Sequence, residues 1–306
     1  MDLIVNIMLG IIIAATPLVF AAIGELVVEK SGVLNLGVEG MMIIGAIAGF
    51  AATIETGSFL AGIIAAALAG AAIAFLFAVL TQTLLANQVA TGLALTLFGL
   101  GLAALIGQGY SGKSAPDFPK LDIPGLTSIP IIGPLIFGQD ALVYLSFALV
   151  AGVAWFLTRT RTGLIIRAIG ENHDAAHAIG YPVVAYRYAT LLFGGACAGL
   201  GGAYLSIVQT PLWVENMTAG RGWIALALVV FAAWRPWRAL LGAYLFGGIT
   251  IIQLHSQALG LEVEPQLLAM LPYLATIIVL VLISHDKTKV RLSAPANLGQ
   301  TFFAST

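Results

Sequence analysis

The run from Gly107 to Ser114, GQGYSGKS, is the clearest candidate for a ligand-binding motif in this chain. It satisfies both the GxxxxGK[ST] pattern of phosphate-binding loops and the GxGxxG pattern of dinucleotide sites. Either loop binds phosphate when it joins a strand to a helix whose N-terminus faces the anion. Here an apolar segment precedes the motif and a proline-rich stretch follows it. We therefore interpret the match as a coincidence and predict no cofactor.

Two histidines form the second candidate. His173 and His177, in HDAAH, have the i, i+4 spacing that places two imidazoles on one helix face, as in zinc sites. A zinc peptidase of this pattern has Glu as general base in the second position, where this chain has Asp174, and no third ligand is evident nearby. We favour a solvated amphipathic helix over a metal site, and we predict no catalytic residues.

Asn35 and Glu39 form the third candidate, because Glu39 is the one acidic residue placed clearly within an apolar stretch. An ionisable group at membrane depth is costly and points to a functional passage. Glycines surround the pair, which indicates a broken or tightly packed helix, and residues 24–40 could add a re-entrant piece. Packing of small residues explains the glycines equally well. We place Asn35 and Glu39 in a translocation pathway.

The composition indicates where these candidates must lie. Of 306 residues, 60% are hydrophobic and 9% are charged, with a mean hydropathy of +1.01, whereas soluble domains average about 25% charged residues. The chain is therefore predicted to be an integral membrane protein. A net charge of -1 argues against nucleic-acid binding. The single Cys197 is interpreted as a small packing residue.

Apolar stretches long enough to cross about 30 Å of hydrocarbon as helices recur along the chain. We predict an all-α polytopic membrane protein, a single transmembrane domain over residues 1–306 with about eight to ten transmembrane helices. The spans are placed near residues 3–23, 38–54, 58–80, 88–107, 139–157, 189–208, 222–234, 239–258 and 267–284. Residues 58–107 and 189–208 contain no Asp, Glu, Lys, Arg or His, so there is little to support catalysis or ion coupling within the bilayer.

Basic residues predict the orientation, because Lys and Arg in short loops stay on the cytoplasmic side. Ten of the thirteen fall in loops on one side of the predicted spans: Lys30, Arg159, Arg161, Arg167, Arg187, Arg235, Arg238, Lys287, Lys289 and Arg291. The other side has Lys113, Lys120 and Arg221. The C-terminus is therefore predicted to be cytoplasmic, and the parity of nine spans puts the N-terminus outside. Two segments are long enough to bind partners, an external loop at 108–138 and a cytoplasmic loop at 158–188.

Residues 14–50 resemble the permease subunits of ATP-binding cassette importers in the branched-chain amino acid, ribose and nucleoside group. The most specific stretch is GELVVEKSGVLNLGVEGMM, from Gly24 to Met42. Residues 165–187 are similar to the cytoplasmic coupling segment of that family, whose GxNxxAAxxxG core is matched here from Gly170 to Gly180. The branch that works with basic membrane lipoprotein-type binding proteins is the most similar.

This resemblance implies a permease in the cell inner (plasma) membrane that forms a pathway for a nucleoside or a simple sugar. It also implies a second homologous permease, a cytoplasmic ATP-binding subunit, and an extracytoplasmic solute-binding protein or lipoprotein. The residues that it assigns to the ATPase contact are Glu171, Asn172, Ala175, Ala176 and Gly180. Two alternatives stay open: a stand-alone secondary carrier or channel for a neutral solute, and an intramembrane enzyme that uses HDAAH or Glu39.

Overall fold

The computed structural model describes residues 2–121, 125–127, 129–258 and 294–303, together with the single positions 270, 274, 277 and 278. Within these residues the chain is helical, and its only β-type pairings are two isolated bridges. Seven helices are long and apolar enough to cross a membrane. The predicted all-α, multi-span architecture is therefore confirmed. The predicted span 267–284, apart from the four single positions, lies outside the described residues.

The helices follow one another along the chain with few long connections. Their bounds are α1 Asp2–Lys30, α2 Val38–Thr56, α3 Phe59–Ala78, α4 Gln88–Gly107, α5 Ala141–Arg159, α6 Arg161–Glu171, α7 His173–Ala178, α8 Val183–Ala203, α9 Arg221–Phe231 and α10 Pro236–Ala258. Short π-helical turns extend α3 over Val79–Thr83 and α8 over Tyr204–Gln209. The segment 108–138 is largely irregular where it is described, as predicted, with short turns at Gln108–Tyr110 and Gly133–Phe137.

Three predicted boundaries were wrong. α1 does not end near residue 23 but continues to Lys30. α8 begins at Val183 rather than near 189, which moves Arg187 from the predicted loop into the first turns of a membrane helix. The predicted span 222–234 is the helix α9, which has 11 residues. At 1.5 Å per residue it is about 16 Å long, about half the hydrocarbon thickness.

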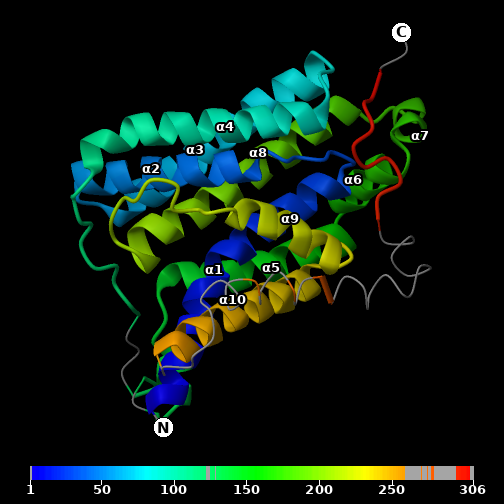
Figure 1. The fold of residues 1–306 in the computed structure, drawn as a ribbon. Helices are drawn as coiled ribbons and strands as arrows, with labels where there is room; N and C mark the ends of the chain where they lie inside the picture. The colour runs from blue at the N-terminus through cyan, green and yellow to red at the C-terminus, as the bar shows by residue number, and fades with distance from the viewer. Residues whose placement is uncertain are drawn as a thin grey trace.

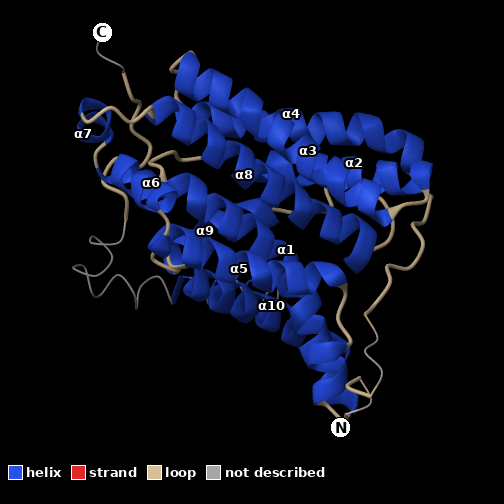
Figure 2. Cartoon of the chain, turned by 180° about the vertical axis from the view of Figure 1, so that it is seen from behind, coloured by secondary structure: helices blue, strands red, loops and turns tan. Residues whose placement is uncertain are grey.

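Three helices, α1, α2 and α8, form the centre of the bundle, and α3 packs across α2 and α8. α4 covers α2 on one side, and α5 and α10 lie along α1 on the other (Figures 1 and 2). Glycines allow this approach. A Cβ added to Gly45 would lie 2.3 Å from the Cα of Gly199, and one added to Gly70 would lie 2.9 Å from it. Cys197 is a free, buried thiol whose Cβ faces Gly24, so it is a packing residue. In lipid there is no hydrophobic driving force between helices, so their association depends on van der Waals packing. Small residues at these contacts allow the close approach that such packing requires.

The basic residues gather at one end of the bundle. This end holds α6 and α7, the C-terminal end of α1 and the segment 294–303, whereas the N-terminus of α1 lies at the opposite end (Figure 1). The described members are Lys30, Arg159, Arg161, Arg167, Arg187, Arg235 and Arg238, and Lys287, Lys289 and Arg291 lie outside the described residues. Arg221, predicted in an external loop, begins α9, and its guanidinium donates to the Met217 carbonyl at 2.9 Å.

Candidate functional site

Residues 31–37 enter the bundle without forming a helix and run beside α4. The Leu34 N–H donates to Oε1 of Gln88 at 2.8 Å, and the Thr96 hydroxyl donates to the Leu36 carbonyl at 3.1 Å. Gln88 and Thr96 are eight residues apart on α4, which is about 12 Å along the helix axis. The break that the sequence predicts between residues 24 and 40 therefore lies at 31–37, and α2 begins inside the bundle.

Glu39 lies in the first turn of α2 and is buried, and its carboxylate binds the N-terminus of α9. Oε1 accepts hydrogen bonds from the Thr218 hydroxyl at 2.5 Å and the Gly220 N–H at 2.8 Å, and Oε2 accepts one from the Gly222 N–H at 2.6 Å. A carboxylate is favoured here, because the free N–H groups and the dipole of a helix N-terminus attract an anion. Gly220 has φ +83°, a conformation that favours glycine. Glu39 thus fixes where the half-length helix begins.

A second buried carboxylate holds the other end of α9. The indole N–H of Trp234, three residues beyond the helix, donates to Oε2 of Glu29 at 2.5 Å. Glu29 lies in the last turns of α1, at the α6–α7 end of the bundle. α9 therefore runs from the depth of Glu39 to that end, fixed at both termini by carboxylates from α1 and α2.

Asn35 is fully buried and supports the break before α2. Its Oδ1 accepts from the Gly37 N–H at 3.0 Å, and its Nδ2 donates to Oε2 of Glu25 at 3.2 Å. Within the described residues no hydrogen-bond partner reaches Oε1 of Glu25. Asn35 is therefore hydrogen-bonded to α1. It does not line the cavity, described below, whose wall includes Glu39.

Glu25 and Glu29 are buried carboxylates that the sequence analysis does not predict, because both follow the apolar run 3–23 that it predicts as the whole first span. The signal that could have found them is the GELVVE stretch, whose two carboxylates have i, i+4 spacing. If the helix continues, this spacing places both on one face. In the structure both side chains are buried inside the bundle.

A cavity of about 600 Å³ opens beside the N-terminal half of α9. Its lining comes from α2, α4, α9, α10 and the chain that leads into α9: Glu39, Leu100, Asn216, Ala219, Gly220, Trp223, Ile224, Ala227 and Phe246. It combines two aromatic rings with an amide, and its one carboxylate already binds the α9 terminus. This volume lies within the range of about 300–1,000 Å³ found for small-molecule pockets. The arrangement can bind a small neutral solute.

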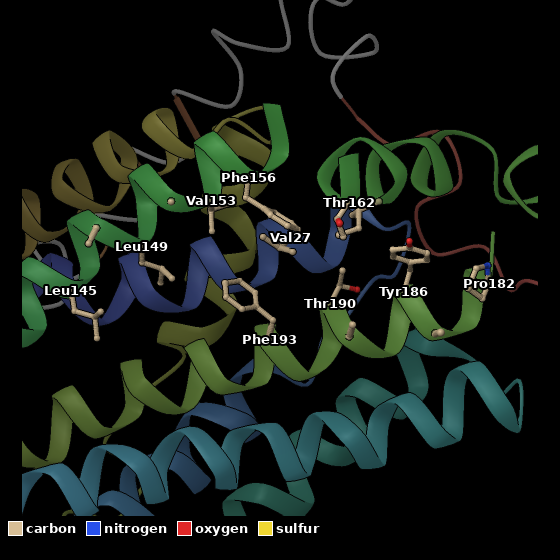
Figure 3. A pocket seen from close by; sticks show the side chains of 15 residues that line it. Val27, Leu145, Leu149, Val153, Phe156, Thr162, Pro182, Tyr186, Thr190 and Phe193 are labelled. Carbon is tan, nitrogen blue, oxygen red and sulfur yellow. The ribbon is translucent and has the colours of Figure 1, made fainter. Parts of the chain in front are cut away.

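A second cavity of about 730 Å³ lies between α5 and α8, with α1 at its floor (Figure 3). Leu145, Leu149 and Phe156 of α5 point toward Phe193 of α8, and Val27 of α1 lies between them (Figure 3). None of the described residues that line it carries a charge. Such a surface favours contact with hydrocarbon rather than with a polar solute, so the smaller cavity is the better candidate for a pathway.

The predicted coupling residues lie on α6 and α7. The Asn172 side chain caps α7 by accepting from the Ala175 N–H at 2.9 Å, and Gly180, with φ +93°, follows the end of the helix. Glu171, Asn172, Ala175 and Gly180 are exposed. Ala176 is buried in a small apolar cluster with Ile165, Ile169, Val183 and Phe302. Ala176 thus attaches α7 to the bundle, whereas the other four residues form a surface.

The two histidines of HDAAH do not share an open site. His173 is buried, and its Nδ1 lies 3.2 Å from a guanidinium nitrogen of Arg187. Burial and the Arg187 charge lower the pKa of His173, with Asp174 acting in the opposite direction. The Phe302 ring lies against both imidazoles, at 5.3 Å from His173 and 5.2 Å from His177 between ring centroids. These contacts explain the two side chains without a metal ion.

The GQGYSGKS run lies at the end of α4. Gly107 packs against the indole of Trp213, and the Lys113 ammonium lies 4.7 Å from the centre of the Tyr110 ring. Ser114 forms an isolated bridge with Leu212. In the described chain from 111 to 121 no helix begins, so the run has no helix N-terminus to face a phosphate. The structural context agrees with the interpretation as a coincidence.

These features define a multi-pass membrane protein, and the family that it matches is one of transporter permeases and not of enzymes. Residues 7–282 match the family described as the permease component of the branched-chain amino acid transport system, and the chain belongs to this family. Membership implies ATP-hydrolysing and solute-binding partner subunits.

Relatives with known names match along almost the whole chain. The chain is 41% identical to the putative glucose ABC transporter permease protein TsgC13 of Haloferax volcanii, over 94% of both chains. It is 34% identical to the nucleoside ABC transporter permease protein NupC of Lactococcus lactis, over 89% of this chain and 90% of the relative. It is 32% identical to the guanosine ABC transporter permease protein NupQ of Bacillus subtilis, over 88% and 89%.

Proposed function

We propose that this chain forms the translocation pathway of an ATP-driven importer for a nucleoside or a simple sugar. The observation that carries the proposal is the cavity beside α9, which joins the Trp223 and Phe246 rings to the Asn216 amide. Sugars and nucleosides are neutral, and they combine polar hydroxyls with faces that stack on aromatic rings. The names of the relatives point to the same two classes of solute.

In this proposal Glu39 and Asn35 have different roles in the pathway. Glu39 lines the cavity and keeps the N-terminus of α9 on its wall, because both of its oxygens accept from the chain around that terminus. Asn35 does not line the cavity; it stabilises the turn that leads into α2 and contacts Glu25. A substitution at either position changes the shape of the pathway rather than removing a direct charge contact with the solute.

The ATP-binding subunit docks on α7 through the surface formed by Glu171, Asn172, Ala175 and Gly180, while Ala176 keeps α7 attached beneath it. The basic residues at this end of the bundle favour a cytoplasmic location for α6, α7 and the C-terminus. A second homologous permease closes the open side of the cavity. A lipoprotein or other solute-binding protein delivers the solute from the opposite side.

Uptake by cells tests this function. Deletion of this chain should abolish uptake of either a labelled nucleoside or labelled glucose, and restoring the chain should restore it. Competition with unlabelled nucleosides and hexoses then identifies the solute class. If the purified chain alone moves the solute into liposomes without ATP, the stand-alone carrier is correct and the importer proposal fails.

The orientation has its own test, since the native Cys197 is buried and gives little background labelling. Asp174→Cys places a thiol on α7, where the Asp174 side chain is 78% exposed. Ser111→Cys places one on the exposed turn after α4. A membrane-impermeant thiol reagent should label Ser111→Cys in intact cells lacking an outer membrane barrier, and Asp174→Cys only in inside-out vesicles. The reverse pattern would invert the assignment.

A further inference from the structure

Residues 294–303, which we call the C-terminal strap, lie across the α6–α7 end of the bundle (Figure 1). The Asn297 N–H donates to the Gly170 carbonyl of α6 at 2.9 Å, and the Gly299 N–H donates to the Gly32 carbonyl, just beyond α1, at 3.0 Å. One strap residue thus binds the coupling segment, and another, two positions later, binds the end of a central membrane helix. The strap connects these two parts directly.

Phe302 anchors the far end of the strap under α7. Its side chain is 5% exposed and packs with Ile165, Ile169, Ala176 and Val183, which come from α6, α7 and α8. The ring also makes edge-on contacts with His173 and His177, one full turn apart on α7. Phe302 therefore fills the space between α7 and the helices that carry it.

Arg187 joins the same elements from inside the bundle. Its side chain is fully buried, and Nε donates to the Ser31 carbonyl at 3.2 Å while Nη1 donates to the Gln300 carbonyl of the strap at 3.3 Å. Nη1 also donates to Oε1 of Gln82 at 3.3 Å, and Nη2 lies 3.2 Å from Nδ1 of His173. One guanidinium thus contacts α7, the strap, the end of α1 and the turn after α3.

α7 depends on these contacts because it has six residues, and a helix of that length is not stable in water by itself. Its own sequence supplies the Asn172 cap at one end and Gly180 at the other. The buried faces of His173 and Ala176 rest on the strap and on α6. Without the strap, a force applied to α7 would displace α7 relative to α6 and α8 and would not be transmitted to the membrane helices.

We propose that the C-terminal strap is part of the coupling device: it locks α7 to α1 and α8, so that a displacement of α7 moves these helices as one body. Phe302 and Arg187 are positioning residues in this device. The inference rests on the proposed function only in that α7 is taken as the element on which the ATPase acts. The attachment of α7 to α1 and α8 is inferred from the contacts of the strap alone.

Phe302→Ala and Phe303→Ala form a matched pair for the test, because Phe303 is the adjacent residue of the same type and is 66% exposed. Both are reconstituted with the complete set of importer subunits. Phe302→Ala should lower the uptake per ATP hydrolysed at least about fivefold while hydrolysis continues, and Phe303→Ala should keep the wild-type ratio. A wild-type ratio in Phe302→Ala would overturn the proposal. Phe302→Leu, which preserves an apolar side chain, replaces Phe302→Ala if the complex does not assemble.

A second readout does not depend on the ATPase. Ala176→Cys places a thiol at a position that is 3% exposed, and its labelling rate reports how well α7 is held. Combination with Phe302→Ala should raise that rate about tenfold or more, whereas Phe303→Ala should leave it unchanged. If the Ala176→Cys thiol is labelled as slowly with Phe302→Ala as without it, the proposal that the strap holds α7 is wrong. If the wild-type complex shows no ATP-dependent uptake, the proposed function fails, and the labelling experiment still decides the strap.

Discussion

The substitution Glu39→Gln should destabilise the bundle by releasing the N-terminus of α9. Oε1 accepts from Thr218 and Gly220, and Oε2 accepts from Gly222. A glutamine has one acceptor oxygen, so its amino group must face at least one of the two glycine N–H donors. The Thr218 hydroxyl can reverse and accept, but a backbone N–H cannot. At least one buried donor is therefore left without an acceptor.

The size of the effect follows from these contacts. Loss of a hydrogen bond to a charged group costs about 1.5–3 kcal/mol, and a buried donor left unpaired costs about 1–3 kcal/mol. The attraction between the carboxylate and the helix terminus adds about 0.3–1 kcal/mol. We expect a total of about 3–7 kcal/mol. At about 2–4 °C per kcal/mol this lowers Tm on the order of 10 °C.

Thermal unfolding of the purified chain in lipid nanodiscs measures this shift, and Glu215→Gln is the matched control. Glu215 is exposed in the segment that leads into α9, so the same chemical change there should leave Tm within about 1 °C. Solute uptake should fall in Glu39→Gln together with stability. If Glu39→Gln unfolds within about 2 °C of the wild type, the carboxylate does not hold α9 and the reasoning is refuted.

Three further substitutions or conditions probe other contacts. Trp234→Phe removes the indole donor to Glu29, which should cost about 1.5–3 kcal/mol and lower Tm. Gly180→Val places a β-branched side chain at φ +93°, and the resulting backbone strain at the end of α7 should lower uptake per ATP hydrolysed. Acidification should loosen α7, because His173 accepts from Arg187 only when neutral. The fold lowers the pKa of His173, so this stabilisation is complete above about pH 6.5 and is lost as the pH falls through the folded-state pKa, which labelling of Ala176→Cys would detect.

Each of these has a control within the chain. Trp237→Phe changes an indole that is 54% exposed, and equal losses in Tm for the two tryptophans would contradict the role of Glu29. Gly57→Val creates the same kind of backbone strain at φ +66°, but at the end of α2. If Gly57→Val impairs coupling as strongly as Gly180→Val, the effect does not depend on the location of Gly180 next to α7. His173→Asn retains an acceptor that does not titrate, so the loosening of α7 in acid should disappear when the labelling rate is compared with that of an exposed thiol at the same pH.

The long apolar helices could be predicted from sequence because their ends carry local signals. α4 runs over the predicted residues 88–107, with Asn87 capping its start through a bond from the Ala90 N–H. The end of α1 could not be predicted, because Glu25 and Glu29 resemble the polar boundary of a span. Their hydrogen-bond partners come from outside α1, and Trp234 is 205 residues away from Glu29 in the chain. Tertiary contacts override the local pattern there.

The candidate site could be predicted in part. Glu39 was singled out because an acidic residue in an apolar stretch is costly without a partner. Its partners are 179 to 183 residues away, so the sequence could not show that the carboxylate binds a helix N-terminus. The cavity that Glu39 shares with Trp223 and Phe246 depends on the same long-range packing. Arg187 was assigned to a loop because its charge, read alone, predicts exposure.

The ATP dependence of transport tests the central claim most directly. This chain is purified from its native membrane in mild detergent together with whatever subunits remain bound, and the complex is reconstituted into liposomes with labelled solute. An ATPase and a second permease should co-purify, and uptake should require ATP hydrolysis together with the solute-binding protein. A chain that purifies alone and moves the solute down its gradient at the same rate without ATP would contradict the account.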